Sequence, residues 1–131
     1  NLTAIYIKSK FGRLSALCGA TVAGTGAACG IVYLLGGGEK EIGHAIQNMI
    51  GNVTGMLCDG AKADCALKIS SCTNAAVQAA VMAMNGIAVS DKDGIVEGDP
   101  EQSINNIARI SHECSRTIDE TVLQIMLSKD R

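Results

Sequence analysis

The cysteines are the residues of this sequence best suited to chemistry. The chain has six, and three of them, Cys58, Cys65 and Cys72, follow one another at intervals of seven residues. A thiolate is both a nucleophile and a ligand for soft metal ions, and the N-terminus of a helix favours this ionised form. The spacing therefore indicates a metal centre or a nucleophile, while the alternative of six buried, inert thiols stays open.

The positions of these cysteines limit which of them can share one centre. Cys58 lies in a stretch interrupted by glycines, and Cys65 is expected in the first turn of the helix that follows. A flexible loop allows both thiols to reach one metal centre. Cys72 lies about 10 Å further along the helix axis, so we expect it to pack as a small apolar side chain. Cys18 becomes the third ligand if its own helix packs beside that one.

Other catalytic patterns are missing from the sequence. There is no HExxH, GxSxG or CxxC motif, and the only histidines are His44 and His112. A lone histidine on a helix is usually a surface or core residue, so we assign neither to a site. No residue stands out as a general base, and the catalytic residues remain unassigned.

Helical periodicity dominates the chain and predicts an all-α fold. We expect a compact helical bundle with two long central helices rich in Gly and Ala, over residues 13–35 and 64–84. Apolar spacing predicts three further helices, over residues 39–52, 99–111 and 115–128, and the Asp99-Pro100 pair is a helix start signal. Residues 87–97 carry β-type side chains and are expected to form an ordered loop or a small edge hairpin.

Length and composition limit the class of protein. With 131 residues, 47% of them hydrophobic, the chain is expected to be a single helical domain over residues 1–131. Aromatic residues make up only 2%, so the core must be built from small aliphatic side chains at close range. The 11 basic and 13 acidic side chains leave a net charge of −2, which argues against a nucleic-acid partner.

One segment is long enough to raise the question of a membrane. No charged residue occurs between Arg13 and Glu39, a run of bilayer-spanning length. Its Ser, Thr, Cys and Gly residues favour a buried helix in a packed bundle, and a membrane helical hairpin is the less favoured alternative. Because a buried helix is favoured, we expect no membrane partner. The cysteine content is typical of a reduced protein of the cytoplasm, so we also expect no structural disulfide.

Several motifs, in order along the chain, resemble the serine dehydratase α-chain-like family, in the branch that holds the L-cysteine desulfidases. The motifs are LSALCG (residues 14–19), GAA (26–28), GIVYLLGG (30–37), GMLCDGAK (55–62), CALK (65–68) and DGIV (93–96). The likeness covers essentially the whole chain but only about the C-terminal third of such proteins. It therefore implies the C-terminal part of a larger lyase-like protein, with the missing N-terminal region as its partner.

The resemblance implies an oxygen-sensitive lyase with a [4Fe-4S] cluster held by three cysteines. Cys18 matches the cysteine of the Gly/Ala-rich helix and Cys58 that of the CD motif. Cys65 matches the CDGAKxxC pattern of the desulfidases, whereas serine dehydratases place their next cysteine further away. Lys62 and Lys68 are candidates for contacts with the carboxylate or leaving group of a small amino-acid substrate, or else are solvated surface side chains.

The implied reaction is β-elimination from L-cysteine, giving pyruvate, ammonia and sulfide, or from L-serine, giving pyruvate and ammonia. The sequence leaves open which of the two is the substrate. The last helix departs from the family, with Cys114-Ser115 and Ile118-Asp119 where relatives carry Gly-Met and Thr-Asp. A non-catalytic structural or interaction module of the same fold is the alternative function, and self-association into a homo-oligomer through exposed apolar surface is also expected.

Overall fold

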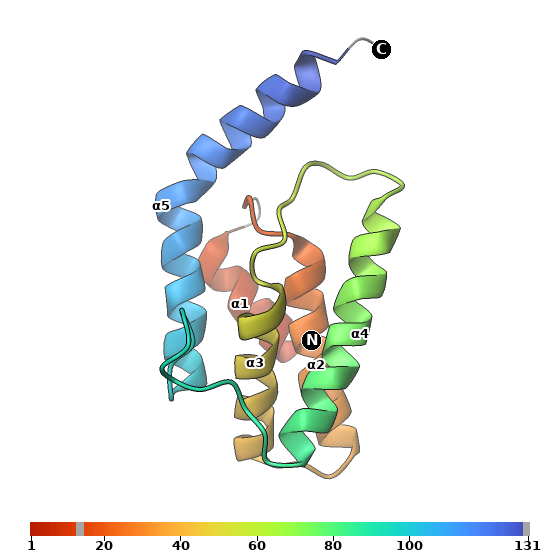
Figure 1. Cartoon of the computed structure of the whole chain (residues 1–131), viewed down its shortest axis with the longest axis vertical. Coiled ribbons are helices and arrows are strands. Elements are labelled where there is room, and N and C mark those ends of the chain that lie inside the picture. Colours follow the sequence, from red (N-terminus) through yellow and green to blue (C-terminus); the bar gives the residue numbers. More distant parts are fainter. Residues whose placement is uncertain (13–14, 130–131) are drawn as a thin grey trace.

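The computed structural model describes residues 1–12 and 15–129, and within them the chain forms helices and no strand (Figure 1). The helices are α1 (Leu2–Phe11), α2 (Gly19–Leu34), α3 (Glu39–Val53), α4 (Cys65–Met84) and α5 (Pro100–Leu127). The predicted all-α bundle is confirmed. None of these helices combines the length and the apolar character that crossing a bilayer requires.

The two long helices α2 and α4 pack against each other along their length, as their small residues predict. They begin at the same end of the bundle and run in the same direction, with α3 antiparallel beside them (Figure 1). Gly24 faces α4 directly: a Cβ on it would lie 3.1 Å from the carbonyl oxygen of Cys72 and 3.1 Å from the Cε of Met49. A larger residue here would require the α4 backbone or Met49 to shift by a few tenths of an ångström.

The core has two parts on either side of α2 and α3. One part lies among α2, α3 and α4, where Val32 and Met49 are fully buried against the alanines of α4. The other joins α1, α2, α3 and α5 through buried branched side chains, including Ile7, Ile46 and Ile104. Small aliphatic residues thus fill the core, and neither Tyr6 nor Tyr33 is buried in it.

The predicted start of the first long helix near residue 13 is wrong. The helix α2 begins at Gly19, and residues 16–18 run antiparallel to residues 56–58, with Leu17 paired to Leu57. The amide of Cys18 donates to the carbonyl oxygen of Met56 and not to a carbonyl one turn earlier, so helix geometry cannot extend through it. Residues 13–14 lie outside the described residues, and before them α1 is a separate helix that the sequence analysis does not single out.

The predicted break between two helices near residues 111–115 is also wrong, because α5 is one continuous helix of 28 residues. No glycine or proline interrupts this stretch. Ion pairs one turn apart, Arg109 with Glu113 at 2.8 Å and Arg116 with Glu120 at 2.9 Å, support the helix on both sides of the expected break. The C-terminal half of α5 therefore continues beyond the bundle (Figure 1).

Residues 87–97 form an ordered loop and no hairpin. Side chains of α3 satisfy its backbone: Asn48 donates to the carbonyl oxygen of Ile87 and accepts from the amide of Val89, both at 2.9 Å, and Gln47 donates to the carbonyl oxygen of Glu97 at 2.7 Å. Because α3 supplies these partners, the segment does not need to pair with itself.

Candidate functional site

A short antiparallel pairing brings Cys18 and Cys58 together. The amide of Cys18 donates to the carbonyl oxygen of Met56 at 3.0 Å, and the amide of Cys58 donates to the carbonyl oxygen of Ala16 at 2.7 Å. Leu17 and Leu57 form an isolated bridge, and Cys18 and Cys58, the residues that directly follow them, are diagonal neighbours across it. Regular pairing places the Cα atoms of such diagonal neighbours about 7–8 Å apart.

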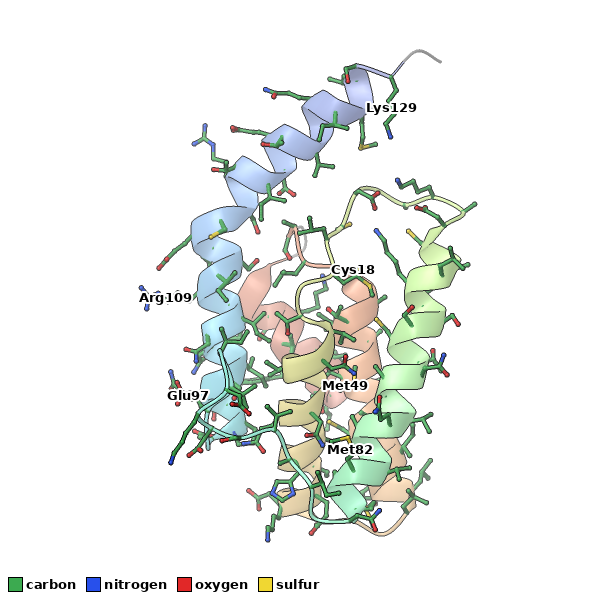
Figure 2. All side chains as sticks on the ribbon, in the orientation of Figure 1. Cys18, Met49, Met82, Glu97, Arg109 and Lys129 are labelled. Atoms are coloured by element: carbon green, nitrogen blue, oxygen red, sulfur yellow. The ribbon has the colours of Figure 1, made fainter. Side chains whose placement is uncertain are left out.

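The third predicted ligand, Cys65, lies close to the same loop. It is the first residue of α4, and its Sγ donates to the carbonyl oxygen of Gly60 at 3.5 Å. Cys18 is the residue directly before α2. Figure 2 shows Cys18 at the end of the bundle where α2 and α4 begin. Two helix N-termini, which favour nearby negative charge, thus meet at the cysteine-bearing end.

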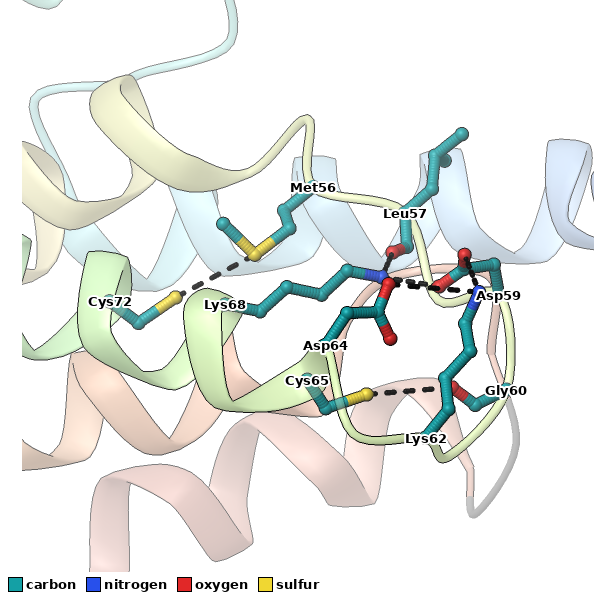
Figure 3. Close-up of polar contacts among 9 residues, drawn as sticks. All are labelled: Met56, Leu57, Asp59, Gly60, Lys62, Asp64, Cys65, Lys68 and Cys72. Carbon is teal, nitrogen blue, oxygen red and sulfur yellow. Dashed lines mark hydrogen bonds and ion pairs between the residues drawn. The ribbon is translucent and has the colours of Figure 1, made fainter.

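Asp59 binds both predicted substrate lysines (Figure 3). Its Oδ2 pairs with the Nζ of Lys62, and its Oδ1 pairs with the Nζ of Lys68. Lys68 also donates to the carbonyl oxygen of Leu57 at 3.0 Å. The structure therefore brings Lys62 and Lys68 together beside Cys58, with Lys62 exposed and Lys68 half-buried.

The charges of this group reinforce one another. Hydrogen bonds from Lys62 and then Lys68 hold the pKa of Asp59 well below its usual range. The hydrogen bond to Asp59 raises the pKa of Lys68, and nearby charge on Cys18 and Cys65 raises it further. Asp64 also pairs with Lys62, at 3.8 Å, so two carboxylates balance the two ammonium groups.

The remaining cysteines have different surroundings. Cys72 is buried, with its Sγ 3.9 Å from the Sδ of Met56, and burial raises the pKa of its thiol, with a smaller contribution from Cys18. Burial also raises the pKa of Cys29, which lies in the core that joins α1 and α5. Cys114 is exposed on α5. All six cysteines, each among the described residues, are free thiols.

The last helix contributes contacts that the sequence analysis misses. The hydroxyl of Ser115 accepts from the amide of Ala16 at 3.3 Å, next to the paired segments. The Cε of Met126 lies 3.5 Å from the position of a Cβ on Gly60. The half-buried residues Ser115, Ile118, Val122 and Met126 follow helical spacing. The spacing gives α5 one half-buried face, and Met126 on that face lies next to Gly60.

The donors in this region fit an iron-sulfur cluster in chemical type. Cysteine thiolates are the usual ligands of such clusters, and Cys18, Cys58 and Cys65 come from neighbouring segments. Across residues 1–12 and 15–129, no three His, Cys, Asp or Glu side chains are gathered around a single-ion site.

Comparison with known proteins defines the class. Residues 1–124 match the serine dehydratase alpha chain family, so the chain belongs to that family, as its motifs predict. Over 98% of its length the chain is 52% identical to a UPF0597 protein of Oleidesulfovibrio alaskensis and 53% identical to one of Porphyromonas gingivalis. A UPF0597 protein of Clostridium perfringens is 52% identical over the full chain. The chain spans only 30–31% of the length of these relatives, and no solved structure matches it significantly.

Proposed function

We propose that this chain is the cluster-holding part of an iron-sulfur-dependent β-eliminating lyase acting on a small amino acid, L-cysteine or L-serine. The observation that supports the proposal is the pairing of Leu17 with Leu57, because Cys18 and Cys58 directly follow these two residues in adjacent segments. Cys65 follows at the start of α4, bonded to the same loop. Membership of the serine dehydratase alpha chain family supports the class of reaction.

The thiolates of Cys18, Cys58 and Cys65 would hold a [4Fe-4S] cluster in this proposal. When bound, such a cluster supplies a Lewis-acidic iron with an open coordination position. The N-termini of α2 and α4 would stabilise the negative charge of the three thiolates, since the partial positive end of each helix dipole lies at this end of the bundle.

The Asp59, Lys62 and Lys68 group would attract the carboxylate of the substrate. Asp59 and Asp64 balance the two ammonium groups, so the contact would depend on an N–H donor that is still available. An ammonium has three N–H donors, and Lys68 uses one on Leu57 and one on Asp59, which leaves a third for a substrate oxygen. Loss of the α-proton and of the β-substituent gives aminoacrylate, which hydrolyses to pyruvate and ammonia.

The remainder of the full-length protein would complete the site. Relatives are about three times as long as this chain, and no described residue is placed as the general base. The helices α2 and α4 present an uncharged outer face, with Tyr33 and Leu34 of α2 exposed by 73% and 83% and Val81 of α4 by 51%. We propose that the N-terminal region, or else a second copy of the protein, covers this face. The cysteine content favours the cytoplasm as its compartment.

A non-catalytic module of the same fold is the second candidate. It is favoured by one observation: Lys62 and Lys68 are both already paired with Asp59, so a substrate must compete with an internal carboxylate. The test is the full-length protein, purified anaerobically and assayed with L-cysteine and with L-serine. The lyase proposal expects pyruvate from at least one substrate, accompanied by an equal amount of sulfide if it is cysteine. Iron-free protein that yields no pyruvate from either substrate would instead support the module.

A further inference from the structure

Lys68 is bonded to the residues on both sides of Cys58 (Figure 3). Its Nζ donates to the carbonyl oxygen of Leu57, directly before Cys58, at 3.0 Å, and to the Oδ1 of Asp59, directly after it. Hydrogen bonds from a charged donor are stronger than those between neutral groups. A single ammonium therefore restrains the backbone on either side of this cysteine.

The same lysine connects three cysteine-bearing segments. It lies on the first turn of α4, three residues after Cys65, so the two share one side of a rigid helix. Leu57, which Lys68 holds by its carbonyl oxygen, is paired with Leu17, the neighbour of Cys18. The bonds of Lys68 thus connect the start of α4 to the Cys58 loop. The pairing of Leu17 with Leu57 connects that loop to the segment of Cys18.

Lys62 lacks this geometry although it is also bonded to Asp59. Its contacts are side-chain ion pairs with Asp59 and, at 3.8 Å, with Asp64, and its side chain is 40% exposed compared with 20% for Lys68. Asp59 belongs to the same loop as Lys62, and Asp64 is the N-cap residue of α4. Lys62 therefore serves as a matched control that shares the Asp59 contact but makes no bond to the carbonyl oxygen of Leu57.

We propose that Lys68 is a positioning residue that fixes the Cys58 loop against α4, so that the thiols of Cys58, Cys65 and Cys18 are presented together. This role rests on the proposed function, in which the three thiols are the ligands of the cluster. The restraint itself does not depend on a cluster, since every contact in it joins groups of this chain.

The experiment is hydrogen exchange of the peptide that spans residues 55–64 in the cluster-free full-length protein. Lys68→Met keeps most of the aliphatic stem and removes both bonds, and we expect exchange at Cys58 to become at least about tenfold faster. Lys62→Met should change the exchange rate at Cys58 by less than about twofold, because an exposed ion pair contributes little to stability. Lys68→Arg, which restores the positive charge and the donors, should recover part of the protection.

Two further results separate the positioning role from a general loss of stability. Asp59→Asn leaves α4 intact and keeps the bond to Leu57, so its effect should be smaller than that of Lys68→Met. Peptides of α2 and α3 should exchange as in the parent protein. Exchange at residues 55–64 that is equal in the Lys68→Met and Lys62→Met variants would overturn the inference.

Anaerobic reconstitution with iron and sulfide then tests the link to the cluster. We expect the Lys68→Met protein to lose iron to a chelator several times faster than the Lys62→Met protein. If the parent protein binds no iron but Lys68→Met still accelerates exchange, the proposed function fails and the positioning role stands. If the parent protein binds iron and Lys68→Met changes neither exchange nor iron loss, the positioning role fails and the proposed function stands.

Discussion

The amide of Cys58 donates a 2.7 Å hydrogen bond to the carbonyl oxygen of Ala16, joining the loop after α3 to the segment before α2. Ala16 is buried, and its own amide donates to the hydroxyl of Ser115 on α5. The backbone around the candidate site is therefore held from three parts of the chain. Changes in the packing of any of these parts are therefore expected to shift the positions of the thiols.

Gly24→Ala should destabilise the fold by about 1–3 kcal/mol, because the added methyl group would press on the α4 backbone at Cys72. Gly30→Ala, in the same helix, is the matched control. A Cβ there meets nothing within 4 Å, so the helix should gain about 0.5–1 kcal/mol. Urea unfolding of both variants measures the difference. Equal stabilities would contradict the close packing of α2 on α4.

Thiol reactivity should follow exposure. Under native, anaerobic conditions Cys114 should be alkylated first, since it is exposed, and Cys29 and Cys72 last, since burial raises the pKa of both thiols. After unfolding in denaturant all six cysteines should react. Peptide mapping by mass spectrometry gives the order. A disulfide in protein kept under reductant, or early labelling of Cys72, would be inconsistent with this structure.

Cys72→Ser should lower stability but leave iron binding in the full-length protein unchanged. The thiol is buried against Met56, and replacing it by a smaller and more polar hydroxyl costs about 1–3 kcal/mol. Cys72→Ala, which adds no polar group, separates that penalty from simple loss of volume. Thermal unfolding and iron content measure the two effects. Loss of iron in both variants would make Cys72 a ligand candidate in its own right.

Glu41 should stabilise the start of α3 in a pH-dependent manner. Its Oε2 accepts from the amide of Gly38 at 2.8 Å, and this bond lowers the pKa of Glu41 in the folded protein. Because the pKa of Glu41 is lowered by folding, its stabilisation of the folded protein is complete above the ordinary pKa of about 4.3. This stabilisation is lost as the pH falls through the pKa of Glu41 in the folded protein. The difference in urea midpoint between the parent protein and Glu41→Gln should thus shrink in acid.

Glu39→Gln controls for this effect in the same helical turn. It reports the general attraction between a helix N-terminus and an acidic side chain, without the bond to Gly38. A pH dependence of equal size in both variants would show that the hydrogen bond of Glu41 contributes nothing specific.

Helix boundaries set by local signals could be predicted from the sequence. The helix α5 begins at Pro100, and the Asp99 side chain accepts from the amide of Glu101 at 2.9 Å, as the Asp-Pro pair predicts. The start of α2 could not be predicted, because the segment containing Cys18 is held by residues distant in the sequence. Its small apolar residues fit a helix equally well, and the tertiary pairing decides between the two conformations.

The same distinction between local signals and contacts of distant residues applies to the candidate site. The spacing of Cys58 and Cys65 across a short loop is local, and Cys65 donates to Gly60 of that loop, while a metal centre shared by the two thiols stays a prediction. The double contact of Lys68 depends on how that loop folds back onto α4, and the position of Met126 depends on the unbroken course of α5. Neither arrangement has a short-range sequence signal that specifies it.

The iron content of the full-length protein with Cys58→Ser, compared with Cys114→Ser, is the most direct test of the cluster proposal. Cys58 lies beside the bridge and Cys114 is exposed on α5, so the two substitutions are chemically identical but differ in position. After anaerobic purification we predict that Cys58→Ser loses the iron and the brown absorbance, whereas Cys114→Ser retains both. Equal iron content in the two variants, with pyruvate formation unchanged, would contradict the assignment of Cys58 as a cluster ligand.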